Sequence, residues 1–432
     1  MAEPSPSSAA GKSAAKAVYP EPVFNHRAGR LLLKTRYWPT ERWADPWSDP
    51  GYRKAAAILV SIILGIGALG WAVGELSDWG AVLYSLIVGL GLPDPIPDIL
   101  WTAIKVLIVL HVILINGLWA IWWERKISAH IQSRLGPMYA GGFHGWAQTI
   151  VDGIKLILKE DIIPSSADRW VHTLAPAIVV SSVILSFAPV LFGDNLSAAS
   201  LDVGVLYIFA VAGISVLGII MAGWASDNKY SLLGGLRGAA QIVSYELPRA
   251  FSVVPVIMVA GSLKLDAIAE AQAGTWGGVI PRWFIFWPHP LFPVVGVLSF
   301  VIFLIASVAE TNRTPFDIPE AESELVSGFH TEYSGMKWSL YFLAEYGFVL
   351  LGSFLMATFY FGGGGAPLPF LDFIPSWIWM LAKAMAMMFV FMWIRWTLPR
   401  LRVDQLMDFN WKFLLPWSFA NIAFAGLFLA LL

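Results

Sequence analysis

Long apolar runs recur along this 432-residue chain and constrain its fold more than any other feature. A helical span across a bilayer needs about 20 consecutive apolar residues. Runs of that length lie near 55–74, 99–123, 172–192, 204–224, 239–262, 291–310, 339–361, 375–398 and 413–432. A shorter run at 81–92 is bounded by Gly and Pro, so we interpret it as interfacial or re-entrant. The pattern predicts an all-α, polytopic transmembrane bundle of about nine spans, with amphipathic interfacial helices on the cytoplasmic side.

Composition agrees with a membrane protein and excludes several kinds of site. Charged residues make up 13% of the chain, against about 25% in soluble domains, and the mean hydropathy is +0.66. The chain has no cysteine, which excludes disulfides and cysteine-ligated iron–sulfur clusters. No dinucleotide-binding fingerprint follows a strand, and no His/Glu spacing resembles a metal site. We therefore expect no bound cofactor, no metal and no nucleic-acid partner.

Lys and Arg are distributed unevenly among the connecting segments, and this predicts the orientation of the chain. We place the N-terminus in the cytoplasm. The loops on the cytoplasmic side, at 124–171, 225–238, 311–338 and 399–412, then carry most of the basic residues of the loops between spans. The opposite-side loops hold only Lys264 and Arg282. The polar loops that can carry function therefore lie on the cytoplasmic side.

The same pattern divides the chain into three parts. Residues 1–54 are polar and form a cytoplasmic extension that we expect to be partly disordered. Residues 55–98 form an extra transmembrane helix and an interfacial segment. Residues 99–432 form the core, with eight of the predicted spans.

An amphipathic segment lies in the first cytoplasmic loop, at 144–160, with the sequence HGWAQTIVDGIKLILKE. Its apolar side chains fall on one helical face, namely Trp146, Ile150, Ile154, Ile157 and Leu158. Such a helix can lie in the plane of the membrane interface. Two interpretations stay open. The helix either covers the bundle as a structural element, or forms a lid over the entry to an apolar chamber.

Acidic residues interrupt the apolar sequence around 310–345, and charge against a bilayer is costly and usually functional. Glu310 ends one predicted span and Glu345 begins the next. The loop between them carries Asp317, Glu320, Glu322, Glu324 and Glu332. We expect Glu320 and Glu324 to share a helix face because they are four residues apart. Like charges this close raise one another's pKa and favour proton sharing. The alternative is a solvated acidic face that meets a basic partner.

Further polar side chains fall inside predicted spans. Glu246 lies in the predicted 239–262 helix, beside the helix breaker Pro248, and a lone intramembrane Glu is more often functional than structural. Lys383 lies deep in its span, whereas Arg395 lies near a helix end, where its side chain can extend to the interface. The residues alone leave two functions open. One is a secondary transporter, and the other is the membrane part of a redox complex.

Several segments resemble the membrane-arm H subunit, also numbered subunit 1, of proton-pumping NADH:quinone oxidoreductase (respiratory complex I). They occur in that family's order and spacing, and include ERKISAHIQSRLGP, GIKLILKEDIIP, GWASDNKYSLLGGLRGAAQIVSYELP, AETNRTPFDIPEAESELVSGFHTEYSGMKW and LPRLRVDQLMDFNWK. The resemblance covers roughly residues 99–432. It implies a multi-pass component of the bacterial cytoplasmic membrane that forms most of a quinone chamber. The expected substrate is quinone, and the expected function couples quinone reduction to proton translocation.

The resemblance also implies roles for individual residues. The proton-coupling positions that it implies are Glu246, Glu310, Asp317, Glu320, Glu322, Glu324 and Glu345. It implies that Arg125 lies near the quinone channel and Arg313 beside the acidic loop. We expect the apolar residues Trp146, Ile150 and Ile154 to line the lipid-side mouth of the chamber. The expected partners are membrane lipid, soluble quinone-site subunits and antiporter-like membrane subunits, and FMN and iron–sulfur clusters are expected in partner subunits.

Two features depart from the family pattern. The family commonly reads GPNRVGP after the first arginine loop, whereas this chain reads GPMYAGG at 136–142 and lacks the loop arginine. The chain also adds about 95 residues before the family's first span. Homologous membrane subunits occur in membrane-bound hydrogenases, F420H2 dehydrogenases and ferredoxin-linked complexes. The acidic loop favours the quinone-reducing kind.

Overall fold

The computed structural model describes part of the chain, namely residues 23–25, 30–32, 79–89, 93, 95–141, 143–193, 197–276, 280–289, 293–320 and 322–431. The chain forms two compact units, Met1–Ala72 and Val73–Leu432. In the first unit, β1 (Val23–Asn25) pairs antiparallel with β2 (Arg30–Leu32). The predicted span at 55–74 lies outside the described residues.

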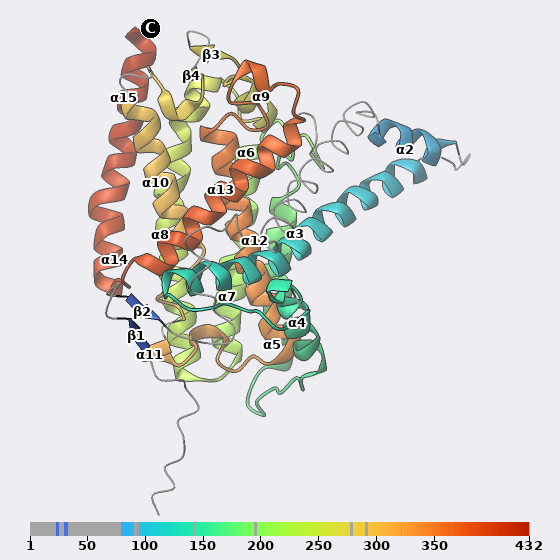
Figure 1. The fold of residues 1–432 in the computed structure, drawn as a ribbon, viewed down its shortest axis with the longest axis vertical. Coiled ribbons are helices and arrows are strands. Elements are labelled where there is room, and N and C mark those ends of the chain that lie inside the picture. Colours follow the sequence, from blue (N-terminus) through green and yellow to red (C-terminus); the bar gives the residue numbers. More distant parts are fainter. Residues whose placement is uncertain are drawn as a thin grey trace, which may run out of the picture. The chain divides into compact units, whose positions relative to one another are not determined.

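The second unit is built from long apolar helices (Figure 1). Seven helical stretches of its described residues are long and apolar enough to cross a membrane. They are α3 (Ile96–Ile131), α5 (Arg169–Ser186), α6 with α7 (Gly204–Ala212 and Ile214–Ala225), α8 (Lys229–Ala260), α12 (Gly335–Tyr360), α13 (Ser376–Thr397), and the run of α14 (Val403–Phe409), η7 (Asn410–Leu414) and α15 (Leu415–Leu431). A shorter apolar helix, α10 (Val294–Glu310), packs against α8 and α12. The predicted all-α, polytopic membrane bundle is confirmed.

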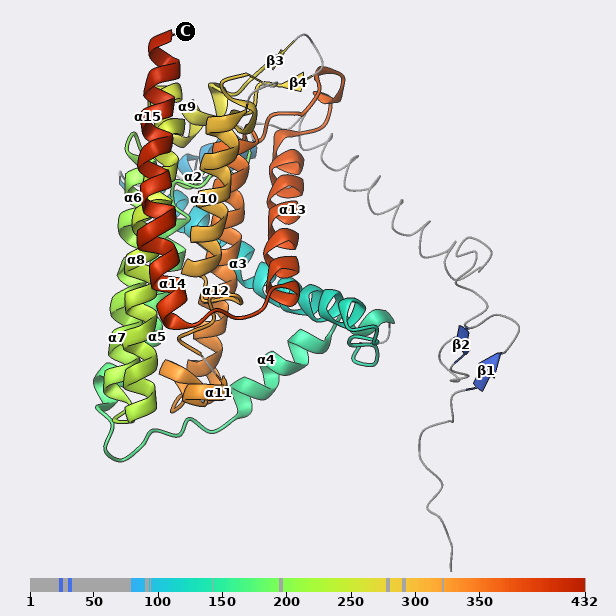
Figure 2. The same cartoon turned by 90° about the vertical axis from the view of Figure 1, so that its left-hand side faces the viewer.

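Short elements connect these helices. The helical ones are α2 (Trp79–Val88), η3 (Phe143–Gly145), α4 (Gln148–Leu158), α9 (Leu265–Glu270), η4 (Phe284–Phe286), α11 (Glu322–Leu325), η5 (Gly328–His330) and η6 (Pro369–Leu371). β3 (Thr275–Trp276) pairs antiparallel with β4 (Ile280–Pro281). Both views place α4 and α11 at the end of the bundle opposite to α9, β3 and β4 (Figures 1 and 2).

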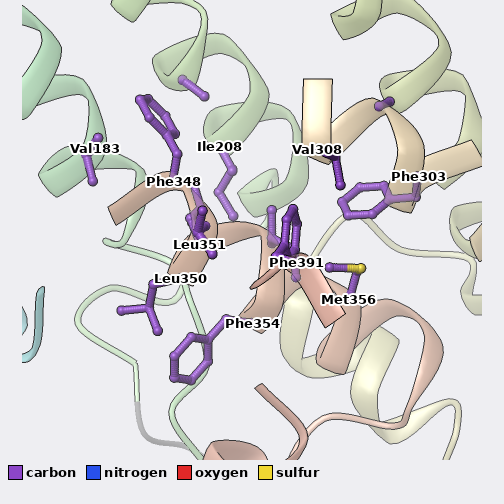
Figure 3. Close-up of a cluster of buried hydrophobic side chains, with 14 of the residues drawn as sticks. Val183, Ile208, Phe303, Val308, Phe348, Leu350, Leu351, Phe354, Met356 and Phe391 are labelled. Atoms are coloured by element: carbon purple, nitrogen blue, oxygen red, sulfur yellow. The ribbon is translucent and has the colours of Figure 1, made fainter. Parts of the chain in front are cut away.

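The helix α12 forms the centre of the bundle. Every residue of α12 from Tyr346 to Tyr360 is buried, as expected for a helix that is apolar on all sides. Its Phe348, Leu351 and Phe354 pack among side chains from several other helices in the cluster of Figure 3. α12 contacts α3, α5, α10 and α13. A polar side chain on α12 is therefore held inside the bundle.

The helix α8 begins ten residues before the predicted span, at Lys229, so the predicted cytoplasmic loop at 225–238 is wrong over most of its length. The side chain of Asn228 caps the helix by accepting from the backbone N–H of Tyr230 at 2.9 Å. Glycines inside this first part allow close packing, because a Cβ added to Gly234 would lie 2.7 Å from the backbone of Gly328. The helix also continues through Pro248, as in the predicted span at 239–262, although proline is a helix breaker.

Candidate functional site

A carboxylate at Glu124 binds side chains from three other parts of the chain. α3 continues to Ile131, so Glu124 lies inside the helix, where it is only 4% exposed. Its Oε2 accepts from Arg313 Nη1 at 2.7 Å and from the Tyr346 hydroxyl at 2.8 Å. Its Oε1 accepts from Arg395 Nη1 at 2.6 Å. Burial disfavours the charge of Arg313, but Glu124, Tyr346 and Glu345 together outweigh burial and raise the pKa of Arg313 above its ordinary value.

This cluster corrects the interpretation of Arg395. The side chain of Arg395 does not simply extend to the interface, because it forms an ion pair with Glu124 from a distant part of the sequence. Sequence reasoning did not select Glu124 as a site residue. The available signal was an acidic residue at the end of an apolar run, directly before Arg125 and Lys126. That pattern also fits an ordinary charged helix end.

Glu320 and Glu345 bring two carboxyl groups together. Glu320 belongs to the loop after α10, and Glu345 lies inside α12, ten residues after that helix begins. Their carboxyl groups lie against each other within hydrogen-bonding reach. Two carboxylates in contact cannot both ionise freely, so this pair favours one shared proton. The expectation that Glu345 opens its span is wrong, because α12 already begins at Gly335.

His330 adds a third titratable group beside this pair of carboxyl groups. Its Nδ1 lies 3.9 Å from Glu320 Oε1, and the ring is buried. Burial lowers the pKa of His330 below its ordinary value, and the charge of Glu320 offsets only part of this effect. A neutral ring therefore faces Glu320 near neutral pH. Such a ring can accept or release a proton if the charge on Glu320 changes.

Glu310 and Glu345 line one small cavity inside the bundle. Its volume is about 20 Å³, and its other lining residues include Thr311, Phe329 and Tyr341. About 10–15 Å³ is sufficient to hold one water molecule. The cavity can therefore hold one water molecule beside Glu310 and Glu345.

Glu310 also forms an ion pair deeper in the bundle. At the end of α10, its Oε2 accepts from Nη1 of Arg249, which is a buried residue of α8. Glu246 lies one turn before Arg249 on α8, within electrostatic range of its guanidinium. The carboxyl group of Glu246 reaches the break between α6 and α7, where its Oε1 would lie 3.0 Å from a Cβ added to Gly213. The predicted intramembrane acids Glu246 and Glu310 thus share a neighbourhood with Arg249.

Glu324 lies outside this cluster. Glu320 and Glu324 do not share a helix face, because α11 begins only at Glu322. Glu324 is exposed and accepts from Arg237 Nη1 at 2.6 Å. That hydrogen bond lowers the pKa of Glu324, against the predicted rise. The backbone carbonyl of Asp317 accepts from the guanidinium of Arg400.

The amphipathic helix forms as predicted, but it is shorter. α4 spans Gln148–Leu158, and Trp146 lies before it, donating to the Gly141 carbonyl at 2.9 Å. Figure 2 shows α4 running obliquely at one end of the bundle. Arg125 of α3 binds Asp152 of α4 at 2.6 Å, which attaches the helix to α3.

The apolar face of α4 is open to its surroundings. Its exposed apolar residues are Ile150, Val151, Ile154, Ile157 and Leu158, and Trp146 before the helix is exposed as well. The far end of the helix is fixed to α12, because the Ser334 hydroxyl accepts from the Ile162 N–H at 2.9 Å and donates to the Glu160 carbonyl. α4 therefore presents an apolar stripe while both of its ends are held.

Other polar residues of the predicted spans have structural partners. Lys383 donates to the carbonyls of Phe361, Gly363 and Gly365 at 2.6–2.8 Å, and so satisfies the open C-terminal end of α12. Lys105 donates to the Ala198 carbonyl at 3.2 Å. Within the described part of the chain, no group of three or more His, Cys, Asp or Glu residues could hold a metal ion.

Comparisons with known proteins identify the family of this chain. A family profile described as NADH dehydrogenase matches residues 104–426. The H subunit of NADH-quinone oxidoreductase from Bacillus thuringiensis (strain Al Hakam) is 45% identical over 332 residues, which cover 76% of this chain and 95% of the relative. The proteins of that name from Bacillus cereus (strain AH187) and Bacillus anthracis (strain CDC 684 / NRRL 3495) match with the same identity and coverage.

Proposed function

Because the chain belongs to the family of NADH-quinone oxidoreductase H subunits, we propose that it forms the quinone chamber and couples quinone reduction to proton translocation. The chain is a membrane component of this oxidoreductase complex, and other subunits of the complex are its partners. The proposal concerns what the chain does there. The observation that carries it is the contact between Glu320 and Glu345, together with the cavity that Glu345 shares with Glu310.

The acidic groups support a path for protons from the loop to the interior of the bundle. Glu320 lies at the loop end, Glu345 and Glu310 line the cavity, and Glu246 lies beyond the ion pair of Glu310. Each step joins a group that can hold a proton to a neighbour that can accept one. A new negative charge on a quinone near Glu320 would draw a proton toward the loop. The groups deeper in the bundle would then lose or rearrange their protons in turn.

The quinone tail is assigned to the side of the bundle that carries α4. A quinone has a long apolar tail and a polar head, so its chamber must open to lipid and become polar inside. The exposed Trp146, Ile150 and Ile154 fit the lipid-side mouth. Arg125 and Arg313 fit the polar end, since each is held by a carboxylate, Asp152 and Glu124 respectively.

The wider setting follows from the same proposal. The protein lies in the bacterial cytoplasmic membrane with residues 1–54 on the cytoplasmic side, and the span at 55–74 precedes a core at 99–432. Soluble quinone-site subunits meet the end of the bundle that carries α4 and α11. FMN and iron–sulfur clusters belong to partner subunits, and antiporter-like membrane subunits receive the coupling signal. We expect no nucleotide-binding site in this chain, and without cysteine it has no thiolate ligand for an iron–sulfur cluster.

The proposal is tested by neutralising the paired carboxyl groups in the assembled complex. Glu345→Gln and Glu320→Gln each remove one acid from the pair while keeping the size of the side chain. Both should lower NADH:quinone reduction in membranes while leaving electron transfer from NADH to a soluble artificial acceptor unchanged. Glu270→Gln is the matched control, because Glu270 is an exposed acid at the opposite end of the bundle. Wild-type quinone reduction in both test variants would remove the pair from the mechanism.

A further inference from the structure

Arg249 is a buried cation between two of the acidic groups. The residue is 2% exposed and lies in the interior of α8, a membrane-length helix. Its Nη1 donates to Glu310 Oε2, and its guanidinium carbon lies 5.2 Å from the ring centre of Phe209 and 5.3 Å from that of Phe303. A charge in such a place is costly unless it is paired, and the apolar rings give it no second hydrogen-bond acceptor.

The charges around Arg249 do not balance when every group is ionised. Glu246 and Glu310 carry two negative charges, and Arg249 carries one positive charge, so the sum is −1. Tyr360 also faces Arg249, and its hydroxyl lies near the Ser252 carbonyl and the Ser299 hydroxyl as a neutral group. One proton on either Glu makes the group neutral. Arg249 is buried and Glu246 is half-buried, so the group is more stable when it is neutral overall.

We propose that Arg249 holds one transferable proton on the pair Glu246 and Glu310, and alternates between the two carboxylates as that proton moves. This inference deepens the proposed function and rests on it. With the proton on Glu246, Arg249 pairs with Glu310, as the structure has it. When the proton leaves the carboxyl oxygen of Glu246 and binds a carboxylate oxygen of Glu310, the guanidinium turns to Glu246. Arg249 keeps its own proton throughout and acts as a positioning residue.

The geometry permits this exchange with little movement. Glu246 and Arg249 are three residues apart on α8, and such residues are neighbours on one helix face. Glu310 approaches the same guanidinium from α10, which packs along α8. Glu246 acts electrostatically on the Arg249 guanidinium, which already pairs with Glu310, so the exchange requires a turn of the Arg249 side chain. Until Glu310 receives a proton, its ion pair with Arg249 would keep the carboxyl groups at the cavity from exchanging protons with Glu246.

The inference is tested with Arg249→Met and Arg249→Lys in the assembled complex in membrane vesicles. Infrared difference spectra count the protonated carboxyl groups, and a pH-sensitive dye follows proton pumping. Arg249→Met should add one protonated carboxyl group in the resting enzyme and lose most of the pumping. Arg249→Lys keeps the charge, so it should retain the wild-type carboxyl count and part of the pumping. An unchanged carboxyl count in Arg249→Met, or equal behaviour of the two variants, would overturn the inference.

Further variants protect this test against a failure of assembly. Arg249→Met with Glu310→Gln removes both members of the ion pair, which buried sites tolerate better than the loss of one. This double variant should assemble but not pump, and wild-type pumping in it would overturn the inference. Lys264→Met is the control, because it removes a distant, partly exposed cation at the other end of α8. Normal pumping in Glu310→Gln would reject the proposed path itself. Loss in Glu310→Gln with normal pumping in Arg249→Met would reject only the role of Arg249.

Discussion

Glu124 holds together three parts of the bundle that are far apart in the sequence. It lies on α3, and its partners lie in the loop after α10, on α12 and on α13. With two arginines and one carboxylate, this cluster is positive when all three are charged. That excess positive charge lies near Glu345, since both arginines act on its carboxyl group. Glu124 therefore positions the charges that act on the proton-sharing pair.

Neutralising Glu124 should destabilise the protein. Glu124→Gln would leave Arg313 and Arg395 without their shared anion, and breaking a buried ion pair from one side costs about 3–5 kcal/mol. We expect less assembled complex on native gels and a lower unfolding temperature in detergent. The control is Asp404→Asn, which removes an exposed pair with Arg402 that contributes about 0–1 kcal/mol. Equal stability of the two variants would show that the Glu124 cluster does not stabilise the bundle.

His330 should make the loop after α10 sensitive to acid. Its pKa is lowered in the folded state by burial, so the unfolded chain binds a proton more readily. The contribution of His330 to the free energy of unfolding is therefore constant at pH values above its pKa in the unfolded chain, which is about 6.5. As the pH falls below that pKa, the folded state loses stability. Hydrogen exchange at residues 322–334, taken relative to the intrinsic exchange rate at each pH, should rise as the pH is lowered through this range. His330→Gln should flatten that rise, and an identical pH profile in both proteins would contradict the assignment.

At the scale of elements, the apolar runs predicted the helices well and the loops poorly. The run at 239–262 is only part of α8, because Gly234 and Gly235 are helical and pack closely against neighbouring backbone. There, tertiary packing outweighs the low helix propensity of the glycines. The spacing of Glu320 and Glu324 was also misleading. It indicated a helix, but the loop carries Glu320 toward α12 and leaves Glu324 in contact with Arg237.

The amphipathic helix α4 was recognisable from its period, and its role can be tested by size. Ile150→Trp enlarges a side chain in the exposed apolar stripe. It should slow the reduction of long-tailed quinones more than that of short-tailed analogues, because only a long tail still fills the mouth when the head is bound. The measurement is the steady-state rate with each quinone in the assembled complex.

Lys155→Trp provides the matched control for this variant. Lys155 lies on the polar side of α4, where its ion pair with Asp152 is long at 4.0 Å and exposed. Lys155→Trp adds the same indole ring to the same helix, but outside the apolar stripe. If Ile150→Trp slows the reduction of long-tailed and short-tailed quinones equally, the entry lies elsewhere. The same conclusion holds if Lys155→Trp slows the reduction of long-tailed quinones as selectively as Ile150→Trp does.

At the scale of the whole molecule, function depends on contacts that no single segment reveals. The sequence identified Glu246, Glu310, Glu320 and Glu345 as unusual, because acids are rare among apolar spans. It could not show that Glu320 meets Glu345, or that Arg249 pairs with Glu310, since these contacts depend on how helices pack. Arg249 and Glu124 were missed for the same reason. Each looks ordinary until its partner from another helix is known.

The central claim is that the acids inside the bundle carry the coupling between quinone reduction and proton movement. The most direct test is the number of protons pumped per NADH oxidised, measured in inside-out vesicles for wild type, Glu310→Gln and the control Glu270→Gln. Glu310 lies past the Glu320–Glu345 pair on the proposed path, so Glu310→Gln should interrupt that path without removing the proposed quinone site. The account predicts a clearly lower ratio for Glu310→Gln and the wild-type ratio for Glu270→Gln. A wild-type ratio in Glu310→Gln would contradict it.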